Sequence, residues 1–376
     1  MKWEKVKLGN VTDSCLGKML DQNKNKGDYQ PYLANVNVRW GEFDLEDLPL
    51  MKFEESEQER YELKYGDLVI CEGGEPGRCA IWKEQIPNMK IQKALHRVRV
   101  HDCLDYRYLF YWFLLAGKTG ELDQYFTGAT IKHMPGQKLK EVVIDKPPLE
   151  IQHRIADILS AYDDLIENNQ KQIKLLKEAA QRLYKEWFVD LHFPGHENTK
   201  IVDGVPEGWR RGLLKELISV NYGKDQKKVP DDGNIPVYGS GGLMRKCNKS
   251  LFSGEAVLIP RKGSLNNIMY VDETFWTVDT MFYATMKQPH TAVFVYFFVK
   301  AFDMYSMNIG AAVPSMTTKI LDAMDVVIPD KETLEKFDKY AKVYFNKIKT
   351  LQGQNEQLKT ARDLLLPKLM SGEVEV

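Results

Sequence analysis

Two long stretches of the chain carry apolar residues at alternating steps of three and four, which is the spacing of a coiled-coil seam. In the first stretch one extra residue separates Asn169 from Ile173, whereas the alternation in the second stretch is unbroken. The sequence therefore predicts two long helices. Their seams are Ile155, Ile158, Tyr162, Leu165, Asn169, Ile173, Leu176, Ala180, Leu183 and Trp187 in the first, and Leu334, Phe337, Ala341, Tyr344, Ile348, Leu351, Asn355, Leu358, Arg362 and Leu365 in the second.

Neither predicted helix can bury its seam alone, because helices in proteins gain most of their stability from tertiary packing. The economical arrangement is that the two helices pack on each other in antiparallel fashion. Pro147 and Pro148 precede the first helix, and Pro367 is expected to stop the second. Asn169 and Asn355 fall within the seams, where a polar residue commonly fixes the register at some cost in stability.

The segments that precede the two helices resemble each other. Residues 1–146 and 192–329 both mix short apolar runs with glycine-rich turns, which indicates short strands. Each contains an aromatic helical segment (106–115 and 293–302) and a final apolar strand (142–144 and 326–328). Gly128-Ala129-Thr130 in the first segment returns as Gly310-Ala311-Ala312 in the second. We predict an α+β protein with two pseudo-symmetric domains, 1–146 and 192–329, joined by two antiparallel helices, 147–191 and 330–376.

Composition narrows the class of protein. A length of 376 residues is enough for two or three domains. No run of 18 apolar residues occurs and the N-terminus lacks an apolar signal core, so we expect neither a membrane span nor secretion. The five cysteines are scattered without a Cys-x-x-Cys pair, which argues against structural zinc and a disulfide framework. We expect a cytoplasmic protein.

A search for catalytic motifs finds none that is convincing. The chain lacks His-Glu-x-x-His and a phosphate-binding Gly-x-x-x-x-Gly-Lys-Ser/Thr, and Gly239-Ser240-Gly241-Gly242 lacks the spacing of a dinucleotide loop. Asp145-Lys146-Pro147-Pro148 matches the acidic Pro-Pro motif of amino-methyltransferases poorly, because a lysine intrudes and no aromatic follows. Pro-Asp occurs at 230–231 and 329–330 without the Glu-x-Lys of metal-dependent nucleases. We therefore expect no catalytic residues, no metal site and no cofactor on this chain.

The net charge of −1 does not by itself indicate a nucleic-acid binder. However, basic residues gather in 76–101 and 244–262, at comparable places of the two repeats, and such strips can serve a phosphate backbone. Arginine, lysine and asparagine read guanine and adenine edges, and lysine and serine hold phosphates. The candidates for DNA contact are Lys24, Lys26, Tyr29, Arg39, Arg78, Lys90, Lys93, Lys132, Lys224, Lys227, Lys228, Tyr238, Ser240, Arg245, Lys246, Arg261, Lys262, Asn266 and Asn267.

Four motifs, in this order along the whole chain, resemble the specificity subunit of type I restriction–modification systems. Residues 147–155 are similar to the family's Pro-Pro-Leu-x-Glu-Gln-x-x-Ile helix start, although Ile151 stands where glutamate is usual. The other three motifs are Leu183-Tyr184-Lys185-Glu186-Trp187-Phe188-Val189-Asp190, Val205-Pro206-Glu207-Gly208-Trp209 and Arg362-Asp363-Leu364-Leu365-Leu366-Pro367-Lys368-Leu369-Met370-Ser371-Gly372.

The resemblance implies two target recognition domains that each bind one half of a bipartite double-stranded DNA sequence. The two helices would set the gap between the half-sites and dock two modification subunits. Those partners would bind S-adenosylmethionine and methylate adenine, and restriction subunits that use ATP and Mg²⁺ can join the complex. Two alternatives stay open from the residues alone: a self-contained DNA methyltransferase or nuclease, and a protein scaffold that does not bind DNA.

Overall fold

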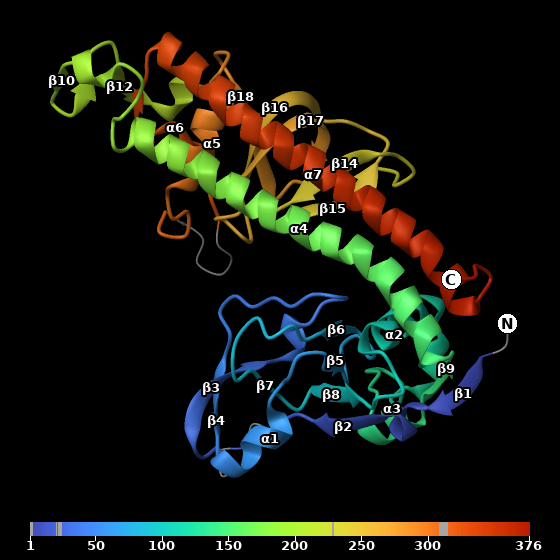
Figure 1. The fold of residues 1–376 in the computed structure, drawn as a ribbon. Helices are drawn as coiled ribbons and strands as arrows, with labels where there is room; N and C mark the ends of the chain where they lie inside the picture. Colours follow the sequence, from blue (N-terminus) through green and yellow to red (C-terminus); the bar gives the residue numbers. More distant parts are fainter. Residues whose placement is uncertain (1–2, 20, 22–24, 228, 308–314) are drawn as a thin grey trace. The chain divides into compact units, whose positions relative to one another are not determined.

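The chain forms two compact units. The computed structural model describes residues 3–19, 21, 25–227, 229–307 and 315–376 (Figure 1). Unit 1 comprises residues 1–169 and 354–376, and unit 2 comprises residues 170–353. The long helices α4 (Leu149–Phe188) and α7 (Lys331–Ser371) each pass through both units. Pro367 lies inside α7, so the expectation that it stops this helix is wrong. Because the compact units cut across both helices, the predicted four-part division at residues 146, 191 and 329 stays a prediction.

Unit 1 is built from short strands, most of which pair in antiparallel fashion. β1 (Glu4–Lys7) pairs with β9 (Val143–Lys146). A four-stranded sheet has the order β2 (Thr12–Leu16), β8 (Leu95–Val100), β5 (Leu68–Cys71) and β6 (Cys79–Ile81). A three-stranded sheet has the order β4 (Leu50–Phe53), β3 (Asp28–Leu33) and β7 (Lys90–Ile91), and in this sheet β3 and β7 pair in parallel. The helices of this unit, besides its parts of α4 and α7, are α1 (Gln58–Tyr61), α2 (Tyr106–Thr119) and α3 (Gly136–Glu141).

Helix α2 forms the centre of the core of unit 1. Asp105 caps its N-terminus by accepting the backbone N–H groups of Arg107 and Tyr108, and Gly120 ends it in the left-handed conformation with φ 76°. Its aromatic side chains are buried together with residues of β5, β8 and the first turns of α4. The predicted aromatic helix 106–115 therefore exists and is one turn longer than expected.

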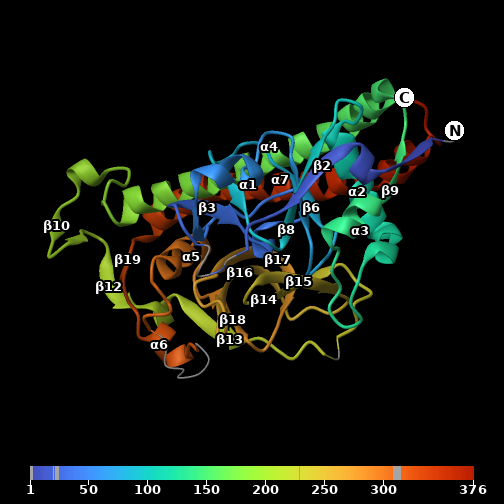
Figure 2. The ribbon, with the colours of Figure 1, turned by 90° about the horizontal axis from the view of Figure 1, so that it is seen from below.

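Unit 2 contains a six-stranded sheet with the order β13 (Ile218–Tyr222), β18 (Met281–Met286), β16 (Phe252–Pro260), β17 (Met269–Thr277), β14 (Ile235–Gly239) and β15 (Gly242–Cys247) (Figure 2). β10 (Ile201–Val202) pairs with β11 (Val205–Pro206), and β12 (Arg210–Leu213) pairs with β19 (Asp325–Ile328). Helices α5 (Ala292–Lys300) and α6 (Thr318–Asp322) complete the unit. Buried aromatic residues of α5 pack with the unit 2 part of α4, where the rings of Tyr184 and Phe297 stack 5.4 Å apart.

The two long helices run antiparallel within each unit. In unit 1, Arg362 pairs with Asp163, and Asn355 is hydrogen-bonded to Asn169. As the residue number rises along α4, the number of the partner residue in α7 falls. In unit 2, Ile173 packs with Ile348 and Leu351, and the rings of Trp187 and Phe337 lie 5.8 Å apart. The predicted fold class, two α+β domains joined by a pair of long antiparallel helices, is confirmed.

The predicted seam of α4 is wrong at Leu165. Leu165 is 52% exposed, whereas the next residue, Ile166, is 6% exposed. Ile158 is only half-buried, and its neighbour Leu159 is fully buried. With Leu159 and Ile166 in place of Ile158 and Leu165, the steps of three and four alternate without interruption, so the apparent extra residue before Ile173 vanishes. The remaining positions of both predicted seams are buried or half-buried: Ile155, Tyr162, Asn169, Ile173, Leu176, Ala180, Leu183, Trp187, Leu334, Phe337, Ala341, Tyr344, Ile348, Leu351, Asn355, Leu358, Arg362 and Leu365.

Candidate nucleic-acid interface

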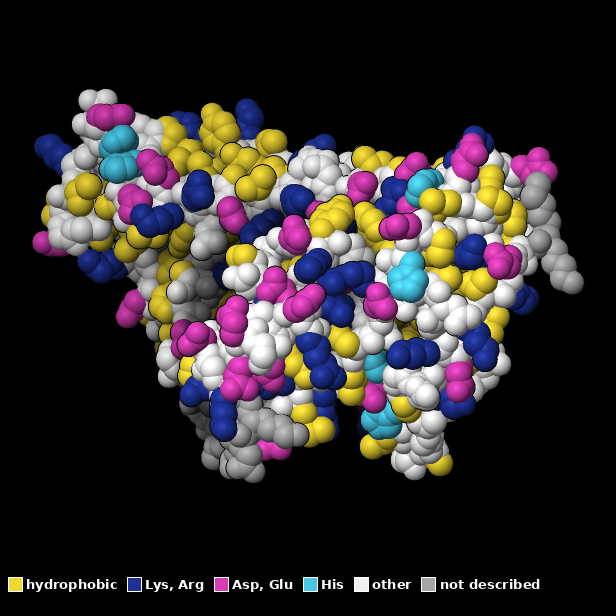
Figure 3. All heavy atoms as spheres, turned by 60° about the horizontal axis from the view of Figure 1, so that its bottom comes forward, with side chains coloured by type: hydrophobic (Ala, Val, Ile, Leu, Met, Phe, Trp, Pro, Cys, Tyr) yellow, Lys and Arg dark blue, Asp and Glu magenta, His cyan; other side chains and the backbone are white. Residues whose placement is uncertain are grey.

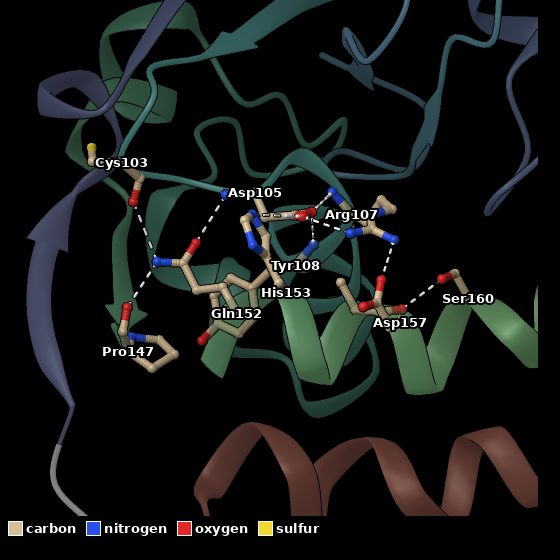
Figure 4. Close-up of polar contacts among 10 residues, drawn as sticks. Cys103, Asp105, Arg107, Tyr108, Pro147, Gln152, His153, Asp157 and Ser160 are labelled. Carbon is tan, nitrogen blue, oxygen red and sulfur yellow. Dashed lines mark hydrogen bonds and ion pairs between the residues drawn. The ribbon is translucent and has the colours of Figure 1, made fainter. Parts of the chain in front are cut away.

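A hydrogen-bonded network fixes the start of α4 to the globular part of unit 1 (Figure 4). The Gln152 side chain is fully buried; it accepts the backbone N–H of Asp105 at 2.9 Å and donates to the backbone oxygen of Pro147 at 2.8 Å. Arg107 bridges the carboxylates of Asp105 and Asp157 at 2.9 and 2.6 Å. Burial alone would lower the pKa of Arg107, but these two carboxylates raise it, so the guanidinium stays charged. The network makes α4 a rigid base for α2 and the strands behind it.

In unit 2, Trp209 ties the globular part to the start of α7. Its indole nitrogen donates to the Asp330 carboxylate at 3.0 Å, and Asp330 also accepts the backbone N–H of Thr333 at 3.0 Å. Asp330 is therefore the N-cap of α7. Burial would raise the pKa of Asp330, but the hydrogen bonds from Thr333 and Trp209 lower it below the ordinary value.

Each unit carries a loop that directly follows a buried strand segment. Loop 1 (residues 72–78) follows β5 in unit 1, and loop 2 (residues 261–267) follows β16 in unit 2. Both loops contain a glycine with positive φ, 74° at Gly74 and 86° at Gly263, a backbone conformation that favours glycine. A Cβ atom at Gly263 would meet the Ser240 hydroxyl at 2.7 Å, so this loop also approaches its neighbour closely.

Loop 1 is clamped to the turn that follows β3. The Arg78 guanidinium donates to the backbone oxygen of Asn35 at 3.2 Å and to its side-chain oxygen at 2.7 Å. The Asn35 amide in turn donates to the backbone oxygen of Gly73 at 2.5 Å. On the other side, the backbone N–H of Met134 donates to the backbone oxygen of Glu72 at 2.7 Å. These bonds hold the loop between two segments that are distant in the sequence.

Loop 2 repeats this clamp with different side chains. The Asn267 amide donates to the backbone oxygen of Ser240 at 2.8 Å, as Arg78 does to Asn35. The backbone N–H of Met316 donates to the backbone oxygen of Arg261 at 2.9 Å, as Met134 does to Glu72. The two modules therefore present one loop geometry on two different sets of side chains, a correspondence that none of these residues signals in the sequence.

Apart from Lys90, the predicted DNA contacts of module one (the globular part of unit 1) fall into three groups. Lys26, Tyr29, Lys93 and Lys132 are exposed; a Lys52 ammonium lies 5.2 Å from the Tyr29 ring, and Lys132 lies 3.4 Å from Asp123. Arg39 and Arg78 are braces, because Arg39 donates to the backbone oxygens of Val36 and Val38 and Arg78 holds loop 1. Lys24 lies outside the described residues.

Lys90 is wrongly predicted as a DNA contact. Its side chain is fully buried, and its ammonium pairs with the Glu62 carboxylate at 2.6 Å and donates to the backbone oxygen of Asn88 at 3.0 Å. A lysine that is enclosed and paired in this way is not accessible to a phosphate. Lys90 belongs to the two-residue strand β7, and both residues of this strand are buried.

In module two (the globular part of unit 2), Lys224, Lys227, Lys246, Lys262 and Asn266 are exposed, and Tyr238, Ser240, Arg245, Arg261 and Asn267 are half-buried. Several of them support loops. Arg245 donates to the Gln226 side chain and to the backbone oxygen of Val229, and the Tyr238 hydroxyl donates to Glu273 at 2.6 Å. Asn266 donates to Asp303 at 3.0 Å. Lys228 and the repeated Gly310-Ala311-Ala312 lie outside the described residues.

The surface charge is mixed. On the face shown in Figure 3, lysine and arginine side chains stand among aspartate and glutamate side chains. Within the described residues, no group of three or more His, Cys, Asp or Glu side chains is placed to hold a metal ion, and no helix has the length and apolar character needed to cross a membrane.

Comparison with known proteins decides the family. The family model described as type I restriction modification DNA specificity domain matches residues 1–178 and 206–360, which is most of the chain. The chain belongs to this family. Its resemblance to type I specificity subunits is thereby confirmed, and its role is DNA sequence recognition in a type I restriction–modification system.

Individual members of the family match along most of the chain. The type I restriction enzyme MjaIX specificity subunit of Methanocaldococcus jannaschii is 27% identical over 352 residues, covering 83% of this chain and 78% of that protein. The MjaVIII specificity subunit of the same organism is 24% identical over 414 residues, covering 100% and 93%. The crystal structure of the type I S subunit from M. genitalium has the same fold, with a TM-score of 0.59 at 19% identity, covering 98% of this chain and 96% of that one.

Proposed function

We propose that each module of this specificity subunit reads one half of a bipartite, asymmetric DNA target. The observation that carries this proposal is the repeated loop clamp, Arg78 on Asn35 in module one and Asn267 on Ser240 in module two. A rigid loop geometry that occurs twice with different side chains is suited to two related docking sites with different bases. Because the side chains differ between the modules, the two half-sites should differ as well.

We further propose that α4 and α7 set the distance between the half-sites and dock two modification subunits. Within each unit the antiparallel pair is sealed by buried residues, and Asn169 and Asn355 fix its register. S-adenosylmethionine, ATP and Mg²⁺ belong in this proposal to the modification and restriction subunits, and this chain contributes sequence recognition without catalysis. The complex works in the cytoplasm.

A module exchange tests the assignment of the half-sites. Residues 1–146 are replaced by the matching segment of another family member, and the chimaera is produced together with its modification subunit. Long-read sequencing then maps the methylated sites. The proposal predicts that one half of the methylated sequence changes and the other half and the gap stay the same. A change in both halves, or in neither, would contradict it.

A matched insertion tests the spacer. Seven residues placed after Asn169 in α4 must be accompanied by seven before Asn355 in α7, because the bond between these two residues fixes the register. One heptad lengthens a helix by roughly 10 Å, which equals about three base pairs of DNA. We expect the gap to grow by about three base pairs with both half-sites unchanged. An insertion in α4 alone is the control and should instead destabilise the helix pair. An unchanged gap in a folded, active complex would refute the spacer role.

A further inference from the structure

We propose that loops 1 and 2 are the base-reading loops of the two modules, and that Glu72 and Arg261 set opposite base preferences at equivalent positions. This inference rests on the proposed function, in which each module reads one half-site. It adds to that function the residues that discriminate and the bases that they select.

Glu72 and Arg261 occupy the same place in the backbone of their modules. The N–H of Glu72 donates to the backbone oxygen of Ala94 at 2.9 Å, and the N–H of Arg261 donates to that of Thr280 at 2.8 Å. Their carbonyl oxygens accept the N–H groups of Met134 and Met316, respectively. The residue that follows each of them forms an isolated antiparallel bridge, Gly73 with His133 and Lys262 with Ser315. Both positions are therefore fixed on both sides by backbone hydrogen bonds.

The side chains at these two positions are not held by hydrogen bonds or ion pairs within the described residues of their loops. Glu75 and Arg78 are used within loop 1, since Glu75 pairs with Arg78 at 3.0 Å and accepts the Trp40 indole N–H at 2.7 Å. The half-buried Glu72 carboxylate makes no hydrogen bond or ion pair with any described residue. Half-buried Arg261 lies 5.8 Å from the exposed ring of Tyr222 and, among the described residues, pairs with no carboxylate.

The chemistry of the two groups points to different bases. A guanidinium presents two parallel donors that match the O6 and N7 acceptors of guanine in the major groove, whereas a carboxylate accepts from the N4 amino group of cytosine. A carboxylate is repelled by phosphates, so a DNA-facing Glu72 is suited to a base rather than to the backbone. Module two should therefore require guanine, and module one cytosine, at the base pair that its loop reaches.

The experiment uses the complex of the full chain with its modification subunit. The methylated sequence of the wild-type complex is mapped first, and the module exchange assigns each half-site to its module. Binding is then measured to duplexes that carry this sequence and each of its single base-pair changes. We expect Arg261→Ala to reduce discrimination at one G·C pair in the half-site of module two by about 5- to 150-fold, with the other positions unchanged. Glu72→Ala should act likewise at one cytosine in the half-site of module one.

Matched controls and milder variants keep the result interpretable. Lys215→Ala and Glu46→Ala remove exposed side chains of the same charge from the same modules and should leave the sequence preference intact. Arg261→Gln and Glu72→Gln keep most of the side-chain volume, and thermal unfolding verifies that each variant is folded. Weakening that is uniform over all duplexes, together with a smaller salt dependence, would overturn the inference by assigning a phosphate contact. An unchanged sequence preference would overturn it as well. A wild-type complex without any sequence preference would instead refute the proposed function.

Discussion

We expect the Asn169 and Asn355 side chains to stabilise the protein as a hydrogen-bonded pair rather than independently. The Asn169 side-chain amide donates to the Asn355 side-chain oxygen at 2.8 Å, and the two residues are 8% and 7% exposed. Within unit 2, Ile173 of α4 packs with Ile348 and Leu351 of α7. If one asparagine is replaced by alanine, the other keeps a buried amide without its partner.

The expected magnitude follows from that orphaned group. A buried polar group that has lost its partner costs about 1–3 kcal/mol, so Asn169→Ala and Asn355→Ala should each lower the free energy of unfolding by that amount. The double variant leaves no orphan, and it should therefore cost less than the sum of the single variants by at least ~1 kcal/mol. The better helix propensity of alanine acts at each site independently and cancels in this comparison.

The assay is a double-mutant cycle measured by urea unfolding. The wild type, both single variants and the double variant are followed by far-ultraviolet circular dichroism and by tryptophan fluorescence. Asn198→Ala, in a short turn away from the seams, is a control that should change stability little. If the cost of the double variant equals the sum of the single costs within ~0.5 kcal/mol, the two residues act independently and the argument for a register-fixing pair is refuted.

Two further predictions concern the buried Lys90, compared with the exposed Lys93, and the helix cap Asp330. Lys90→Ala should lower the free energy of unfolding by about 3 kcal/mol, because it leaves the half-buried Glu62 unpaired, and it should not reduce DNA affinity per folded molecule. Lys93→Ala should instead reduce DNA affinity and leave the free energy of unfolding unchanged. If the two variants have equal effects in urea unfolding and in DNA binding, the distinction between these lysines is contradicted. Asp330→Ala should cost about 1–2 kcal/mol through loss of the α7 cap. The pKa of Asp330 is lowered in the folded state, so the stability that its carboxylate contributes is present above about pH 4 and is lost as the pH falls further. The free energies of unfolding of the wild type and of Asp330→Ala should therefore converge in acid. A difference between them that persists in acid would count against the cap.

The coarse architecture could be predicted from the sequence, because the spacing of apolar residues in the helices and the resemblance of the two halves are both visible in one chain. The spacing from Leu334 to Leu365 predicts a helical face that is buried or half-buried throughout. In α4 the same reasoning chose Leu165 over Ile166, because adjacent apolar residues both fit a pattern of threes and fours. Only packing against α7 decides which of the two faces the partner helix.

The candidate site was harder to predict, because exposure and pairing depend on distant residues. Lys90 and Lys93 look alike in the sequence, yet one is enclosed with Glu62 and the other is exposed. The clamp on loop 1 joins Arg78 to the backbone oxygen of Asn35. Every residue has a backbone oxygen, so a bond of this kind cannot be predicted from the type of residue that accepts it. Glu72 could not be predicted as a site residue from charge, because it is acidic and the equivalent position in module two is the basic Arg261.

The central claim, that one chain reads two unlike half-sites at a fixed separation, is tested most directly by the methylome of cells that carry this chain with its modification subunit. The account predicts a single methylated sequence with two different specific halves and a non-specific gap of constant length. A palindromic sequence, a gap of variable length, or the absence of any methylated sequence in cells with both subunits folded and assembled would contradict it.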